Sequence, residues 1–109
     1  MKAVLQKNFG AADTLYLGEQ STPTPGPGQV LVRVVTTSVN RPDLIQREGN
    51  YPPPRGDSEV LGLEVAGIID AVGEGVDEWT PGDRVMGLVG GGAYAEFARA
   101  WASHLMPVP

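Results

Sequence analysis

The chain is 109 residues long, which is enough for one domain with its own core. Eight basic and thirteen acidic side chains give a formal net charge of −5. This acidic balance argues against nucleic acid as a main partner, because phosphate binding needs a cationic surface. The absence of cysteine excludes disulfides, cysteine-ligated metal sites and a thiol nucleophile.

The remaining composition narrows the class of protein further. A single histidine, His104, rules out a multi-histidine metal site and leaves little for a serine–histidine–aspartate triad. No apolar run approaches the length of a membrane-spanning helix, and the first ten residues do not resemble a secretory signal. We therefore expect a cytoplasmic protein with neither a membrane nor a nucleic-acid partner.

Short runs of β-branched residues, separated by glycine and proline, predict a mainly β fold. Lys2–Lys7 and Thr14–Glu19 are expected to pair as an opening hairpin. Ser21–Gly28 contains three prolines and two glycines and is expected to be an extended connection. Gln29–Val39 is the strongest predicted strand, and its nearly continuous apolar start indicates burial on both faces.

One helix is predicted, near residues 42–48. Pro42 suits the first helical position, because its missing N–H has no partner there. Asp43 complements the positive end of the helix dipole, and Gly49 is expected to end the helix. A proline-rich loop over residues 50–56 follows and carries Tyr51.

The second half of the chain predicts more strands. Glu64–Val72 is a strong candidate, in which Gly67 indicates a bend, a bulge or a close backbone approach. A turn over Thr80–Asp83 leads into a strand over Arg84–Val89. Residues 93–102 are ambiguous, because their alanines favour a helix whereas their aromatic residues fit a helix and a strand equally.

The first candidate site lies where a strand becomes a helix. Asn40 and Asp43 flank the predicted helix start, where they either line a cleft or simply cap the helix and complement its dipole. Tyr51 is the second candidate. Prolines hold its phenol at low entropic cost, as a binding site requires, but the ring could equally pack over the edge of the sheet.

Glu64 and the glycine run Gly90–Gly92 each have two possible interpretations. Glu64 lies between apolar residues, where a carboxylate is costly unless paired, so it is either a functional acid or base or the partner of an arginine. Gly90–Gly92 either lets a ligand approach the backbone closely or forms a flexible hairpin loop. Structural roles are expected for Trp79, Trp101 and His104.

Four segments in register carry a family resemblance. Gly62–Gly67, followed by Gly73, is similar to the Gly-His-Glu-x-x-Gly motif of zinc alcohol dehydrogenases. Val39–Asp43 resembles their strand-to-helix corner, Pro81–Val85 their Gly-Asp-Arg-Val turn, and Gly91–Phe97 their glycine–alanine–glutamate–aromatic strand. The chain thus resembles the medium-chain dehydrogenase/reductase family over essentially its whole length.

Departures from the zinc pattern indicate a branch of that family. Asn40 stands where the zinc enzymes place a cysteine ligand, and Leu63 stands where they place a histidine. The chain is therefore similar to the zinc-free quinone oxidoreductases, the zeta-crystallin-like branch. This resemblance implies a GroES-like, partly open β-barrel over residues 1–109, the substrate-side domain, without the Rossmann domain that binds NADPH in the family.

The resemblance also implies roles for individual residues. In the family, a hydride passes from the nicotinamide of NADPH to a quinone or enone in the cleft between the two domains. Asn40 and Tyr51 are expected in the cleft wall as catalytic residues, with Asn40 also contacting the nicotinamide side of the cofactor. Asp43 and Gly91 are expected to support the cleft, and no metal is expected.

Two functional hypotheses follow. In the first, the chain is part of an NADPH-dependent quinone or enone reductase, binds no cofactor tightly by itself and is inactive alone. In the second, it is a stand-alone or engineered GroES-like module with a structural or self-associating role and no catalysis. In either case the exposed face of the barrel could form a homo-oligomer.

Overall fold

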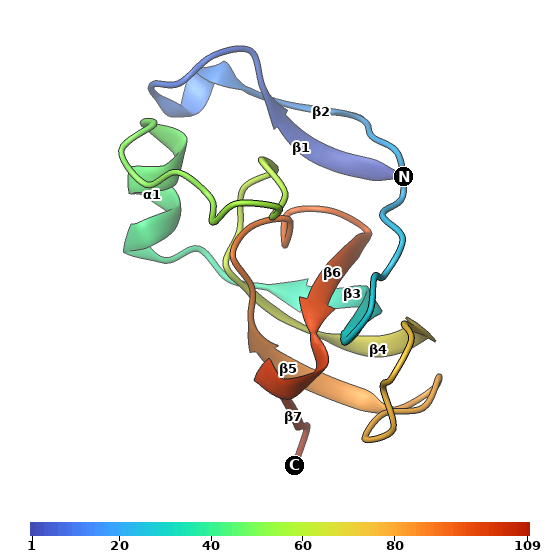
Figure 1. The fold of residues 1–109 in the computed structure, drawn as a ribbon. Coiled ribbons are helices and arrows are strands. Elements are labelled where there is room, and N and C mark those ends of the chain that lie inside the picture. The colour runs from blue at the N-terminus through green and yellow to red at the C-terminus, as the bar shows by residue number, and fades with distance from the viewer.

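The computed structural model describes all residues, 1–109, and has one α-helix in a mainly β fold. Strands β1 (Lys2–Gln6) and β2 (Leu15–Glu19) form an antiparallel hairpin, which confirms the predicted opening. A 3₁₀ turn, η1 (Ala12–Thr14), lies in the connection between them. In Figure 1 the hairpin lies at the top of the molecule, next to the helix; it is a sheet of its own, and Ala3 on β1 forms an isolated bridge with Ala95 just before β6.

The main sheet has five antiparallel strands in the order β6-β3-β4-β5-β7. Their bounds are β3 (Gln29–Thr37), β4 (Glu64–Val72), β5 (Arg84–Leu88), β6 (Phe97–Trp101) and β7 (Leu105–Pro107). The mainly β architecture expected from the sequence is confirmed. The edge strands β6 and β7 do not pair with each other, however, so the sheet is open and not closed into a barrel.

All five strands of the main sheet contribute to the core. Residues Gln29–Val32 at the start of β3 are buried in succession, which confirms the predicted burial of this part on both faces. From Arg33 onward most of the strand is exposed. The main buried apolar cluster is formed by Val30, Val32, Ile69, Val85, Ala100, Ala102 and Leu105.

The strands β3 and β4 approach each other closely at Gly67. A Cβ atom at this position would overlap the carbonyl oxygen of Arg33 on β3. The register of the two strands also shifts beside it, between Val34 and Thr36. The glycine therefore permits both a close backbone approach and a bulge, two of the predicted alternatives.

Helix α1 spans Arg41–Arg47 and so begins one residue earlier than expected. Arg41 is helical although it precedes a proline, because the N–H of Asp43 donates to the carbonyl of Asn40 (3.0 Å) and closes a first turn around both residues. Gly49, with φ +87°, ends the helix as predicted. No helix of the structure has the length and apolarity needed to cross a bilayer.

The ambiguous segment near the C-terminus forms strand β6. It pairs with β3 from Gln29 opposite Trp101 to Arg33 opposite Phe97, so cross-strand pairing overrides the helix preference of its alanines. A 3₁₀ turn, η2 (Ala102–His104), and the short strand β7 follow. Neither of these elements was predicted.

The two tryptophans have the structural roles that were expected. Trp79 packs against the main core, and its Nε1–H donates to the carbonyl of Ala102 (2.9 Å). Trp101 is half-exposed, and its ring covers Gly28. His104 is exposed in η2, so the structure gives it no core role.

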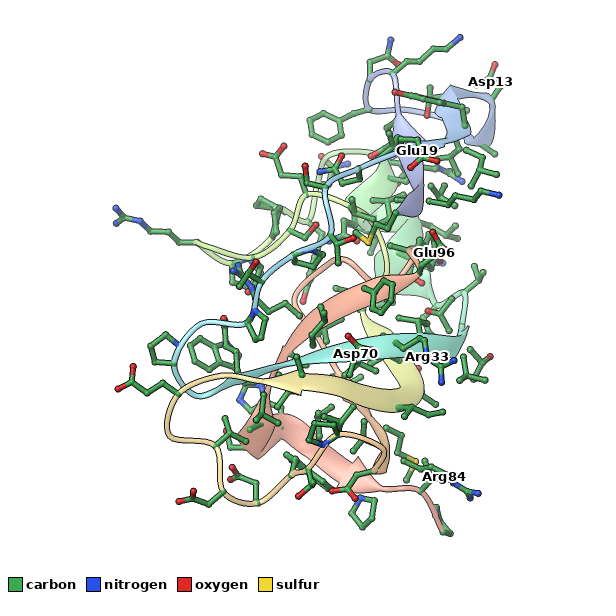
Figure 2. The ribbon with its side chains drawn as sticks, turned by 90° about the vertical axis from the view of Figure 1, so that its right-hand side faces the viewer. Asp13, Glu19, Arg33, Asp70, Arg84 and Glu96 are labelled. Atoms are coloured by element: carbon green, nitrogen blue, oxygen red, sulfur yellow. The ribbon has the colours of Figure 1, made fainter.

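Charged side chains are spread along the surface of the molecule. Figure 2 shows Asp13 and Glu19 at the hairpin end, Arg33 and Asp70 on the central strands, and Arg84 toward the opposite end. One ion pair is formed, between the N-terminal amine and the Glu19 carboxylate (3.6 Å). Since exposed ion pairs contribute little, the fold depends on the core and on backbone hydrogen bonds.

Candidate functional site

Polar side chains meet where β3 ends and α1 begins. Thr37 on β3 pairs with Val65 on β4, and this register places the residues after β3 beside the start of β4. The hydroxyl of Ser38 donates to Oε2 of Glu64 (2.8 Å). Nδ2 of Asn40 donates to the same oxygen (3.0 Å) and to the Ser38 hydroxyl (2.9 Å). We call Ser38, Asn40 and Glu64 the polar corner.

Glu64 is exposed and pairs with no arginine, so the ion-pair alternative raised from the sequence is wrong. The apolar residues around it in sequence suggested burial, but its side chain leaves the core and meets neutral donors. The Ser38 hydroxyl and, to a smaller extent, the Asn40 amide hold the pKa of Glu64 below its usual value of 4.5, against a weaker effect of desolvation. Glu64 is therefore ionised at neutral pH.

Asp43 lies in the first turn of α1 and is almost completely buried, at 2% exposure. Its Oδ2 accepts hydrogen bonds from the backbone N–H of Asn40 (3.0 Å) and from the Tyr94 hydroxyl (2.7 Å). Burial, followed by the hydrogen bond to Asp43 and the charge of Asp43, raises the pKa of Tyr94 above its usual value. Asp43 thus fixes the backbone of Asn40 and the ring of Tyr94 at one point.

Gln46 connects α1 to the chain just before β4. Its side chain is buried, and Oε1 accepts the backbone N–H of Gly62 (3.1 Å). A Cβ atom at Gly62 would collide with the ring of Tyr94 and the side chain of Ala93. The helix, the segment before β4 and the segment before β6 are therefore packed together behind the polar corner.

Tyr51 follows the other end of α1 and is half-exposed, at 45%. It lines a groove of about 790 Å³ between the β1–β2 hairpin, the helix and the proline-rich loop. Phe9 and Tyr16 from the hairpin and Leu61 from the chain before β4 also line this groove. Asn40 does not, so the structure does not gather the two predicted catalytic residues in one pocket.

Gly91 lies in a third place, beside a hollow of about 200 Å³ that Ser58 and Arg99 also line. A Cβ atom at Gly91 would overlap the carbonyl oxygen of Ser58, and the N–H of Gly92 donates to the carbonyl of Val60 (2.7 Å). The glycine run thus packs against residues 57–60. It connects β5 to β6, which are not paired, so the alternative of a flexible hairpin loop is wrong.

The structure brings Asn40 and Asp43 together and adds three residues to them. Ser38 and Tyr94 were not among the predicted site residues, and for Glu64 the sequence left two alternatives, an acid–base role or an arginine partner. Tyr94 is 51 residues from Asp43 along the chain, so no local pattern links the two. In the sequence, only the carboxylate of Asp43 at the helix start pointed to such a contact. A carboxylate that becomes buried requires hydrogen-bond donors from elsewhere in the chain.

Comparison with known proteins shows the family to which this chain belongs. The model of the alcohol dehydrogenase GroES-like domain matches residues 26–109. The chain belongs to this family. Its relatives include quinone oxidoreductases of the medium-chain dehydrogenase/reductase family, which confirms the resemblance stated from the sequence.

Three relatives show the extent of the likeness. The chain is 38% identical over 96 residues to the mouse synaptic vesicle membrane protein VAT-1 homolog-like, covering 88% of this chain. It is 40% identical over 103 residues to a quinone oxidoreductase of Lama guanicoe, covering 92% of this chain. The structure of Escherichia coli quinone oxidoreductase complexed with NADPH matches all of this chain with a TM-score of 0.89 and 30% identity.

This GroES-like chain is much shorter than those relatives. It spans 23% of the VAT-1 homolog-like protein and 31% of the Lama guanicoe quinone oxidoreductase. It likewise spans 33% of the Escherichia coli chain in the NADPH complex. The matched part is therefore a third or less of each of these proteins.

Proposed function

We propose that this GroES-like domain is the substrate-side half of an NADPH-dependent oxidoreductase that reduces a quinone or an enone. One observation carries the proposal: the whole chain superposes on part of a quinone oxidoreductase that binds NADPH. The polar corner supports it, because an exposed amide held in one orientation suits recognition of a carbonyl or hydroxyl oxygen.

Each predicted site residue has a task in this proposal. Asn40 contacts the nicotinamide side of the cofactor or the substrate carbonyl, and Asp43 holds the backbone of Asn40 in place. Tyr51 presents a half-exposed phenol that can hydrogen-bond to an oxygen of the substrate. Gly91 supports the wall from its own hollow, where only a glycine fits against Ser58.

The residues present fit the nicotinamide end of NADPH but not the rest of the cofactor. The polar corner offers an amide donor in a fixed orientation for an oxygen of the nicotinamide ribose or of the substrate. NADPH supplies the hydride, and a hydride acceptor needs no protein nucleophile. This chain contributes positioning and a polar group where negative charge develops on the substrate oxygen.

The donor set at the polar corner does not fit a catalytic zinc. Leu63 has no ligating atom, and Nδ2 of Asn40 is a hydrogen-bond donor to Glu64. Zinc is bound in proteins by cysteine, histidine and carboxylate side chains, and structural sites use four of them. We therefore propose zinc-independent chemistry. We also propose that the protein is cytoplasmic.

The test is NADPH consumption in the presence of quinones and enones. A protein that carries this domain together with a cofactor domain should consume NADPH only when such a substrate is present. Residues 1–109 alone should not, because NADPH has no main site in this chain. The substitution Tyr51→Phe should raise KM or lower kcat, whereas the surface substitution Glu78→Gln should change neither. Absence of NADPH consumption with every quinone and enone would refute the proposal.

A further inference from the structure

The amide of Asn40 is held by an unusual set of partners for an exposed side chain. Nδ2 lies 3.0 Å from Oε2 of Glu64 and 2.9 Å from Oγ of Ser38, and these two oxygens are themselves 2.8 Å apart. The three atoms form a nearly equilateral triangle. Both acceptors therefore lie in one direction from Nδ2, within an angle much smaller than the angle between the two amide hydrogens.

A single amide hydrogen directed between the two acceptors can therefore serve both, which leaves the second amide hydrogen for a ligand. The Ser38 hydroxyl donates its own hydrogen to Glu64, so its oxygen is available as an acceptor. A carboxylate has no donor hydrogen, so only the nitrogen end of the Asn40 amide can face it. Glu64 therefore determines which end of the amide points inward and where the free N–H is directed.

The backbone of Asn40 is fixed independently of its side chain. Its N–H donates to the buried carboxylate of Asp43, which also accepts the Tyr94 hydroxyl. With both backbone and side chain held, the rotamers of an exposed asparagine are restricted before any ligand arrives. Binding then avoids the entropic cost of ordering that side chain.

We propose that Glu64 is a positioning residue, which orients the amide of Asn40 so that its free N–H faces a carbonyl or hydroxyl oxygen of the bound ligand. This inference rests on the proposed function, in which Asn40 faces the nicotinamide ribose or the substrate carbonyl. Glu64 itself does not touch the ligand. It is not a general acid either, because it is ionised at neutral pH and has no proton to donate.

The orientation can be tested on the 109-residue chain by NMR of its side-chain amides. In the wild type, the two Nδ2 hydrogens of Asn40 should differ strongly in chemical shift, and both signals should move as pH falls through the titration of Glu64. The substitution Glu64→Ala should bring the two signals together, and Glu64→Gln should give an intermediate result. The control Glu78→Gln should leave them unchanged. Identical Asn40 signals in wild type and Glu64→Ala would overturn the proposal.

The functional consequence is tested in a protein that also carries a cofactor domain. For variants that remain folded at the assay temperature, Glu64→Ala should lower kcat/KM for the carbonyl substrate by about tenfold. Glu64→Gln should restore part of that loss because it keeps one acceptor, and Glu78→Gln should be unaffected. An active wild type with an equally active Glu64→Ala variant would overturn the positioning role. A wild type that reduces no quinone or enone would instead refute the proposed function, and the NMR result would still decide whether Glu64 orients Asn40.

Discussion

At the scale of single residues, Asp43 is a buried carboxylate that requires hydrogen-bond donors from its surroundings. Carboxylates are rarely buried this deeply unless they are fully paired. Here Oδ2 has two donors, whereas Oδ1 is buried without a hydrogen-bond partner. The Tyr94 hydroxyl is therefore half of the hydrogen bonding that stabilises this group, and it comes from a distant part of the chain.

We accordingly predict that Tyr94→Phe destabilises the fold. It removes a hydrogen bond to a charged, buried acceptor, which costs about 1–3 kcal/mol in the free energy of unfolding. Urea denaturation measures this change. Tyr16→Phe is the matched control, because Tyr16 is half-exposed and its hydroxyl has no recorded partner, so the control should stay within about 0.5 kcal/mol of wild type. Equal stability of the two variants would show that the bond to Asp43 contributes nothing.

Glu64 should make a pH-dependent contribution to stability. Its pKa is lower in the folded state than the ordinary value of 4.5, so the folded state favours the ionised form. The resulting stabilisation is present above about pH 4.5 and is lost as pH falls through the lower, folded-state pKa.

Unfolding experiments on wild type and Glu64→Gln between pH 3 and pH 7 would measure this contribution. The difference in free energy of unfolding between the two proteins should be constant near neutral pH and should shrink below about pH 4.5. A difference that does not depend on pH would mean that the Ser38 and Asn40 hydrogen bonds do not favour the carboxylate.

At the scale of elements, the contact between β3 and β4 determines how the polar corner is assembled. These strands form the centre of the sheet, and their register places Ser38 and Asn40 beside Glu64. Gly67 permits the close approach of the two backbones. A change there should therefore affect both the fold and the site.

The substitution Gly67→Ala should destabilise the protein by about 3 kcal/mol or prevent folding, because the new Cβ would meet a backbone carbonyl that cannot move alone. Gly18→Ala is the control in another strand. There the nearest atom is the end of the flexible Leu5 side chain, and the cost should be about 1 kcal/mol. Thermal unfolding of both variants gives the comparison. A similar, small loss in both would contradict the close approach of β3 and β4.

The sequence predicts those elements in which the intrinsic preference of the residues matches the secondary structure that they adopt in the fold. Gln29–Thr37 and Glu64–Val72 are rich in β-branched residues and became the central strands. Proline, aspartate and glycine marked the helix to within one residue at its start. Strand β6 could not be assigned, because its alanines favour a helix and only pairing with β3 decides the outcome. Strand β7 has three residues, too few to show a pattern.

The residues of the candidate site were predictable only where a single stretch of sequence contains the pattern that identifies them. Asn40 and Asp43 stand at a strand-to-helix corner, and their positions alone drew attention to them. The partners of Glu64 and the hydroxyl that meets Asp43 depend on tertiary contacts over 24 to 51 residues. The alternative of an arginine partner for Glu64 was wrong, because an exposed carboxylate needs no opposite charge and here accepts hydrogen bonds from neutral donors.

At the scale of the whole molecule, exposed apolar side chains flank the polar corner. Val39, between Ser38 and Asn40, is 75% exposed, and Leu88, which pairs with Glu64 across the sheet, is 66% exposed. Val39 follows the end of β3 and Leu88 ends β5, and in Figure 1 these two strand ends lie on the side of the sheet nearer the helix. Apolar groups around an exposed polar site are suited to contact with another protein surface.

We therefore predict that the 109-residue chain self-associates at high concentration through this surface. Sedimentation velocity over a range of concentrations should show a homo-oligomer, and Leu88→Lys should weaken it by placing a charge in the contact. Met106→Lys, at a similarly exposed apolar residue on the edge strand β7, is the control. A chain that stays monomeric at every concentration, or equal effects of the two substitutions, would contradict this prediction.

In the proposed function, this domain forms one wall of a site where a hydride reaches an activated carbonyl compound. The most direct measurement uses NADPH that carries deuterium at the transferred position, with an enone as substrate and a protein that combines this domain with a cofactor domain. We expect deuterium on carbon in the reduced product, with less product formed by the Asn40→Ala and Tyr51→Phe variants. A reduced product without deuterium, or no reduced product at all, would contradict it.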